Sequence, residues 1–259
     1  MRLPIFEVDA FTSQVFRGNP AAVCPLSSWL DDATLQSIAA ENNLSETAFV
    51  VGGEGAYEIR WMTPTAEVDL CGHATLASAF VLFAETEKGR DEVVFRSKSG
   101  ELRVRREGDL LTLDFPSRPP RTVTATDDLL EGLGRPPREV WAARDYLAVY
   151  EREEDVRALA PDFARLARAD RFAVIVTAPG RQVDFVSRFF APKQGLPEDP
   201  VTGSAHCTLV PFWSKRLGKT RLHALQVSAR GGELFCEDRG ERVAISGHAV
   251  RYLQGTIEV

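Results

Sequence analysis

The sequence predicts an α+β protein of two similar halves, each with a mostly antiparallel sheet wrapped around one central apolar helix. Two observations predict this class. Short motifs recur at a nearly constant offset, and each half combines many short strand-like segments with one long segment almost free of charge. The chain has 259 residues and 44% hydrophobic content, which is enough for a sizeable core in one large domain or two smaller ones.

An internal repeat divides the chain near its middle. The motifs that match in the same order are Ser99–Leu102 with Gly231–Leu234, Gly108 with Gly240, Gly72 with Gly203, and Trp61–Pro64 with Phe189–Pro192. The first two pairs are 132 positions apart and the third pair 131. We therefore expect two halves, residues 1–117 and 118–259, joined by the Pro-rich segment Ser117–Thr126, with the last strand free to cross to the first half.

Hydrophobic periodicity places the expected elements. Short strands bounded by Gly, Asp and Pro are expected at Phe6–Phe11, Thr47–Val51, Tyr57–Met62, Val93–Ser97, Leu102–Arg105 and Leu111–Phe115. Ala74–Ala84 and Ala205–Trp213 are almost free of charge and are expected to form buried helices. Surface helices are expected at Asp31–Asn42, with Asp31 or Asp32 as the N-cap, and at Glu154–Ala169.

Composition excludes several classes of function. The formal charge of −6 and the pI of about 5.4 leave no basic surface for a nucleic acid partner. No stretch approaches the roughly 18 apolar residues of a membrane span, and the first residues do not resemble a signal peptide, so a cytoplasmic location is expected. The four cysteines are far apart and form no CxxC pair, which favours free thiols over disulfides or a zinc site.

Each central helix begins at a glycine, Gly72 or Gly203. Unpaired backbone N–H groups and the helix dipole favour an anion at such a position. Thr75, Thr202 and Ser204 are placed to cap the helices or to hydrogen-bond a ligand carboxylate. Alternatively, the glycines and serine only mark strand–helix junctions. Because the pattern occurs in both halves, we expect two anion sites.

Three other residues have side chains suited to proton transfer or substrate binding: Glu46, His73 and Asp199. Each also has a structural alternative, as a turn residue or as a helix residue satisfied by backbone. Cys71 and His73 are two positions apart, so we do not expect them to face each other on a helix as nucleophile and base. His206 is expected in the core or at a subunit contact. No nucleotide fingerprint or metal-ligand cluster occurs, so neither a cofactor nor a metal is expected.

Four motifs together resemble the signatures of the PhzF family, and among its members the phenazine biosynthesis-like domain-containing proteins. These motifs are Phe16–Val23, Asn43–Phe49, Cys71–Thr75 and Glu198–Ala205. Their order and spacing agree with the family over essentially the whole chain. The resemblance implies the diaminopimelate epimerase-like fold, an active site in the cleft between the halves, a small acidic metabolite as substrate, and usually a homodimer.

The resemblance also implies roles for individual residues. Glu46 matches the family glutamate that shuttles a proton when trans-2,3-dihydro-3-hydroxyanthranilate is isomerised. One carboxylic acid can give a proton to one carbon and take one from another on the same face, so one base is sufficient. His73, Asp199 and Ser204 match residues that bind or polarise the substrate. The full expected substrate-binding set is Cys71, Gly72, His73, Ala74, Asp199, Thr202, Gly203, Ser204 and Ala205.

Two alternatives remain open at this stage. Related epimerases use two cysteines, one at each helix start, and here Cys71 occupies the first position but Thr202 the second. A hydroxyl cannot replace a thiolate near neutral pH, which disfavours a two-thiol racemase but not a variant that uses Cys71 alone or with Glu46. The second alternative is a non-catalytic interaction protein on the same fold.

Overall fold

The computed structural model describes residues 1–259 and divides the chain into two compact units. Unit 1 comprises residues 1–114 and 246–259, and unit 2 comprises residues 115–245. The chain leaves unit 1 within β8 (Leu110–Pro116) and returns within β17 (Arg242–Gly247). The sequence predicted a boundary at 117/118 and allowed the last strand to belong to the first half. The structure does place residues 246–259 in unit 1.

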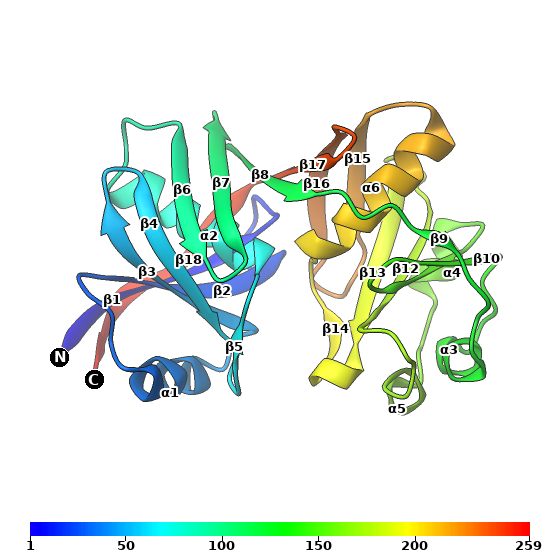
Figure 1. Ribbon diagram of the computed structural model, residues 1–259, viewed down its shortest axis with the longest axis horizontal. Helices are drawn as coiled ribbons and strands as arrows, with labels where there is room; N and C mark the ends of the chain where they lie inside the picture. Colours follow the sequence, from blue (N-terminus) through cyan, green and yellow to red (C-terminus); the bar gives the residue numbers. More distant parts are fainter. The chain divides into compact units, whose positions relative to one another are not determined.

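Unit 1 is one mixed sheet with two helices (Figure 1). Its further elements are β1 (Arg2–Ala10), β2 (Asn19–Leu26), α1 (Asp32–Asn42), β3 (Glu46–Gly53), β4 (Ala56–Met62), β5 (Glu67–Val68), α2 (Gly72–Glu85), β6 (Glu92–Ser97), β7 (Gly100–Glu107) and β18 (Ala249–Glu258). The strands follow the order β18-β1-β2-β3-β4-β6-β7-β8, and β5 adds to β4. The β2–β3 and β4–β6 pairs are parallel, and the other pairs are antiparallel.

Unit 2 repeats this arrangement. Its elements are β9 (Arg121–Thr122), α3 (Asp127–Leu133), β10 (Glu139–Ala142), β11 (Tyr146–Val149), α4 (Glu153–Arg157), α5 (Phe163–Leu166), β12 (Val174–Pro179), β13 (Phe185–Ala191), the 3₁₀ turn η1 (Pro192–Gln194), β14 (Leu196–Asp199), α6 (Gly203–Leu217), β15 (Arg221–Gln226) and β16 (Gly232–Asp238). The strand order is β9-β10-β11-β12-β13-β15-β16, with β14 added to β13.

The strand pairings of the two units correspond one to one. The run from β1 to β7 and the run from β10 to β16 share the same sequence of antiparallel and parallel pairs, with α2 and α6 at equivalent positions. Gly108 and Gly240 also correspond, since both follow an equivalent strand with positive φ, 61° and 78°. The predicted α+β class is confirmed, although each sheet contains two parallel pairs beside its antiparallel ones.

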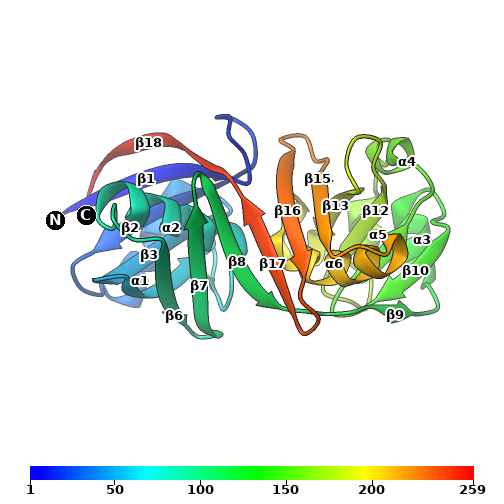
Figure 2. The same ribbon diagram turned by 90° about the horizontal axis from the view of Figure 1, so that it is seen from above.

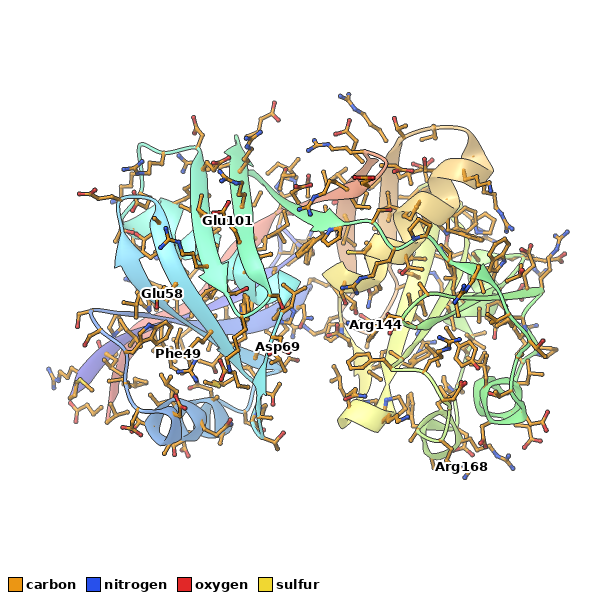
Figure 3. The ribbon with its side chains drawn as sticks, viewed as in Figure 1. Phe49, Glu58, Asp69, Glu101, Arg144 and Arg168 are labelled. Atoms are coloured by element: carbon orange, nitrogen blue, oxygen red, sulfur yellow. The ribbon has the colours of Figure 1, made fainter.

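The central helices are buried on nearly all sides, as their lack of charge predicts. In α2 the buried positions include Ala74, Ala77 and Ala79, whose small side chains let β1, β2 and β3 pack closely around the helix. Helix α1 covers the other face of the sheet, where Leu35 and Ile38 pack against Phe49 of β3 (Figure 3). Its sequence-predicted N-cap, Asp31, accepts a hydrogen bond from Thr34 N at 2.9 Å.

Two expectations about unit 2 need correction. The helix predicted over Glu154–Ala169 was wrong, because α4 and α5 are separate and only five and four residues long. Pro161 lies between them; it cannot donate the hydrogen bond of a continuing helix, and Asp162 instead caps α5 by accepting from Arg165 N. The segment Ser117–Thr126, expected to join the halves, lies wholly within unit 2, where it contains β9 and Arg118 N donates to Cys207 O at 2.9 Å.

Candidate functional site

Glu46, Cys71 and His73 lie together in unit 1. His73 Nε2 is 3.1 Å from Glu46 Oε2, and His73 Nδ1 is 3.5 Å from Cys71 Sγ. The imidazole therefore lies between a carboxylate and a thiol, with a different ring nitrogen facing each. The side chains of His73 and Glu46 are 6% and 17% exposed, so Glu46 is the more accessible of this pair.

Local backbone geometry brings Cys71 to His73. Cys71 is the N-cap of α2 with an extended backbone, φ −139° and ψ 111°, and His73 lies in the first turn. The expectation that these two side chains do not face each other was wrong, because the rule for residues two apart applies to helical backbone and Cys71 precedes the helix. Thr75 Oγ1 donates to Cys71 O at 2.5 Å and fixes this first turn.

Asn19 is a fourth member of this cluster, which the sequence reasoning did not include among the site residues. It begins β2, is fully buried, and its Nδ2 is 3.1 Å from His73 Nδ1. In the neutral imidazole, Asn19 donates to Nδ1 and Nε2–H faces Glu46; in the imidazolium, the amide must present Oδ1 instead. The sequence signal that could have found it is the glycine directly before it, Gly18. The structure explains that glycine, since its φ is 65° and a Cβ there would lie 2.2 Å from Ala10 O.

Burial and neighbouring charge set the protonation states of the cluster. Burial raises the pKa of the Cys71 thiol to about 11, and the charge of Glu46 acts in the same direction against the smaller influence of His73. Cys71 is therefore a thiol at neutral pH, despite its position at a helix start. Burial opposes a charge on His73, but negative charge on Cys71 or Glu46 raises its pKa well above the ordinary value. Because Cys71 stays protonated, Glu46 is the partner that matters.

Glu46, Cys71 and His73 are also residue types that bind metal ions. One ligand atom from each of Glu46, Cys71 and His73 lies within 4.8 Å of the others. However, the thiol faces Nδ1 and the carboxylate faces Nε2, on different sides of one ring. A metal binds in the ring plane along the lone pair of a single nitrogen, so these ligands do not converge on one ion position. The arrangement fits a carboxylate held beside an imidazole better than metal binding.

A second cluster lies at the start of α6 in unit 2. Thr202 Oγ1 donates to Asp199 Oδ2 at 2.5 Å, and both residues are buried. Gln226, at the end of β15, holds the segment: its Oε1 accepts from Thr202 N and its Nε2 donates to Asp199 O, both at 2.8 Å. Sequence reasoning missed Gln226, because nothing in the sequence relates a glutamine at a strand end to a loop 24 residues away.

Ser204 lies in the first turn of α6 beside a cation that the sequence did not indicate. Arg144 Nη2 donates to Ser204 Oγ at 3.4 Å, pairs with buried Asp145, and has its guanidinium 4.3 Å from the centre of the Phe172 ring (Figure 3). Asp145 and Phe172 hold the guanidinium in place. This puts a positive charge next to Ser204.

His206 lies two residues further along α6 and belongs to the core. It is fully buried, its Nδ1 is 2.9 Å from Thr202 O, and its ring centre is 5.9 Å from that of Phe185. Burial lowers its pKa to about 4 against the opposing effect of the Thr202 carbonyl. The remaining predicted residues, Gly72, Ala74, Gly203 and Ala205, all lie in the first turns of α2 and α6. Neither helix has a strong N-cap like Asp31, since Cys71 is a thiol and the Thr202 hydroxyl donates to Asp199.

A family model described as phenazine biosynthesis-like protein matches residues 8–255. The chain belongs to the PhzF family. An uncharacterized isomerase of Pseudomonas aeruginosa is 56% identical over the full length of both chains, and the human phenazine biosynthesis-like domain-containing protein is 41% identical over 99% of each. These relatives and the PhzF fold identify the chain as an enzyme of the isomerase class.

Solved structures agree with this assignment. A PhzF family protein from Enterococcus faecalis superposes with a TM-score of 0.98 at 47% identity over all of both chains. A hydroxyproline epimerase from Agrobacterium vitis shares only the fold, with a TM-score of 0.63 and 11% identity over 99% of this chain and 92% of that one. The PhzF chain therefore has an epimerase-like fold, as the sequence predicts. No helix in the structure is long and apolar enough to cross a membrane.

Proposed function

We propose that this PhzF family member is a cofactor-independent isomerase that moves a proton on a small carboxylate-bearing metabolite, with Glu46 as general acid and base. The observation that carries the proposal is the 3.1 Å contact between Glu46 Oε2 and His73 Nε2, made by a carboxylate that keeps 17% of its side chain exposed. A proton shuttle must reach both the substrate and a group that stabilises its charge. The exposed part of the Glu46 side chain supports the first requirement, and its contact with His73 supports the second.

His73 supports Glu46 as a positioning group in this proposal. Its ring is held on the other side by Asn19 and Cys71, and Nε2 lies 3.1 Å from the Glu46 carboxylate. The imidazole stabilises the carboxylate when Glu46 has given up its proton, and the contact weakens when Glu46 is protonated. One carboxyl group then alternates between acid and base without a second residue.

The alternative of a thiol-based epimerase is less well supported. The pKa of about 11 leaves Cys71 protonated near neutral pH, and Thr202 occupies the equivalent position in unit 2. A thiol with such a pKa is a poor base, and a threonine hydroxyl is a worse one. The complete set of Glu46, His73, Asp199 and Ser204 likewise favours catalysis over a purely structural role.

The substrate is proposed to carry a carboxylate. Two features support this: each central helix starts without a strong side-chain cap, and Arg144 places a positive charge next to Ser204 at the start of α6. Helix starts and guanidinium groups both bind carboxylates, the first through backbone N–H groups and the second through paired donors. Dihydro-hydroxyanthranilate, the substrate class implied by the family resemblance, fits this requirement.

The test is deuterium incorporation from D₂O into carbon, followed by NMR over a panel of small unsaturated acids and amino acids that includes dihydro-hydroxyanthranilate. Glu46→Gln keeps the shape and hydrogen bonding of the side chain but cannot exchange a proton. We expect it to fold, to bind acids, and to lose roughly 100-fold to 10,000-fold in exchange rate.

A matched control is available in the turn that follows the same strand. Glu54→Gln, in the exposed turn just after β3, makes the same chemical change away from the cluster and should leave exchange unchanged. Full-rate exchange in Glu46→Gln would remove Glu46 from the mechanism. If wild type exchanges deuterium into no compound of a broad panel, the isomerase proposal fails in favour of a non-catalytic protein on the same fold.

A further inference from the structure

The two ring nitrogens of His73 face different partners. Nε2 is 3.1 Å from Glu46 Oε2, and Nδ1 is 3.1 Å from the amide nitrogen Nδ2 of Asn19. A neutral imidazole carries one N–H, and the hydrogen bond made by one nitrogen determines which nitrogen bears that proton. The group that faces Nδ1 therefore determines what His73 presents to Glu46.

Asn19 is fixed by the backbone around it. It is the first residue of β2, which pairs with β1 and follows the loop that joins the two strands (dark blue in Figure 2). This loop is closed by a hydrogen bond from Phe16 N to Asp9 Oδ2 at 2.8 Å, and it ends at Gly18, whose φ of 65° favours glycine. Since Asn19 is also fully buried, its amide has little freedom to move away from His73.

Both groups near Nδ1 are hydrogen-bond donors. Beside the Asn19 amide, the thiol of Cys71 lies 3.5 Å from Nδ1, and its pKa of about 11 keeps the S–H proton in place near neutral pH. A proton on Nδ1 would point at the N–H group of Asn19, which is repulsive. The surroundings of Nδ1 therefore favour a bare nitrogen that accepts a hydrogen bond.

The other side of the ring favours a proton on Nε2. His73 Nε2 and Glu46 Oε2 are both shielded from solvent, and neither has another hydrogen-bond partner. One proton between them serves a buried ring nitrogen and a buried carboxylate oxygen at the same time. With Nδ1 bare, the single proton of a neutral ring lies on Nε2 and faces Glu46.

Burial opposes the imidazolium form of His73. It is the largest influence on the pKa of His73 and lowers it, whereas negative charge on Cys71 and on Glu46 raises it. Cys71 carries no charge as a thiol, so Glu46 alone acts in the raising direction. The Asn19 N–H acts with burial, since a donor to a bare nitrogen stabilises the neutral ring. Asn19 thereby offsets the tendency of Glu46 to draw a second proton onto the ring.

His206 in α6 shows the opposite arrangement. Its Nδ1 is 2.9 Å from Thr202 O, and a carbonyl only accepts, so Nδ1 of His206 bears the proton. The chain thus holds two buried histidines whose Nδ1 atoms face a donor in one case and an acceptor in the other. They are expected to be opposite tautomers, which provides an internal reference within one protein.

We propose that Asn19 is a positioning residue that holds His73 as a neutral ring protonated on Nε2, so that His73 donates to Glu46 but carries no proton to or from the substrate. The proposal rests on the function proposed above for Glu46. An imidazolium beside Glu46 would stabilise the carboxylate more strongly and weaken its affinity for the proton that it must return. By excluding that form, Asn19 leaves Glu46 as the single proton carrier.

NMR of ¹⁵N-labelled protein tests the protonation state directly, because protonated and bare ring nitrogens have well-separated ¹⁵N shifts. At pH 7 wild type should show His73 protonated on Nε2 and bare on Nδ1, and His206 the reverse; His73→Gln and His206→Asn assign the two rings by loss of their signals. Asn19→Asp replaces the donor by a carboxylate of the same shape and should give His73 protonated on both nitrogens. A wild-type His73 protonated on Nδ1, or an unchanged tautomer in Asn19→Asp, would overturn the proposal. The wild-type spectrum decides the tautomer even if the variant fails to fold.

Deuterium exchange links the state of His73 to turnover. In Asn19→Asp the imidazolium should make Glu46 harder to protonate, so the acid limb of the pH–rate profile should move to lower pH and the exchange rate at pH 7 should fall by about tenfold or more. Asn43→Asp, the same change at the exposed C-cap of α1, is the control and should leave spectra and profile unchanged. A doubly protonated His73 with an unchanged profile would refute the positioning role. If wild type exchanges into no compound, the proposed function fails, while the spectra still decide the tautomer.

Discussion

Lowering the pH from 7.5 to 4 should remove about 3 kcal/mol of folding stability through His206 alone. The folded pKa of this buried imidazole is about 4, against an ordinary value of 6.5 in the unfolded chain. A base whose pKa is lowered on folding binds fewer protons folded than unfolded between these values, so stability is present above pH 6.5 and is lost as pH falls. The loss should reach about 2 kcal/mol at pH 5.

His206→Asn isolates this contribution. The amide nitrogen of Asn can replace Nδ1 as donor to Thr202 O, but the side chain does not titrate. The variant is less stable at pH 7.5, because it loses ring packing against Phe185, but its deficit should shrink by about 3 kcal/mol by pH 4. Carboxylates titrate equally in both proteins and cancel from the difference.

Urea unfolding at pH 7.5, 6, 5 and 4, followed by circular dichroism at one protein concentration, measures this difference. Parallel stability curves for wild type and His206→Asn would show that His206 is not buried in its neutral form. An NMR titration of the His206 ring with a midpoint near 6.5 would refute the reasoning in the same way.

Two further substitutions test the clusters at the helix starts. Cys71→Ser should keep deuterium exchange within roughly tenfold of wild type, about 1.4 kcal/mol of barrier, because Glu46 serves both half-reactions; complete loss in a folded variant would instead favour thiol chemistry. Gln226→Leu leaves Thr202 N–H and Asp199 C=O buried without their partner and should lower the free energy of unfolding by about 2–4 kcal/mol. Gln194→Leu, in the exposed turn η1, is its control and should be nearly neutral; equal unfolding midpoints for the two leucine variants would contradict the bracing role of Gln226.

Elements held by local interactions were predictable from the sequence. α1 and its cap at Asp31 follow from the periodicity and from one side chain that bonds three residues ahead. The buried helices follow from their lack of charge, and the repeat follows from glycines at equivalent turns. The single helix predicted over Glu154–Ala169 was wrong. The segment has a helical pattern of apolar residues, but Pro161 interrupts it and two short helices form instead. The cytoplasmic location and the roles of the site residues stay predictions.

By itself the sequence determined the α+β class, the duplicated design and the candidate groups Glu46 and His73, because composition, period and motif order are properties of the chain alone. Only the tertiary structure decided which groups meet. Asn19 and His73 are 54 positions apart, and Gln226 lies 24 positions from Thr202. Such contacts depend on strand order and register, which no local pattern encodes.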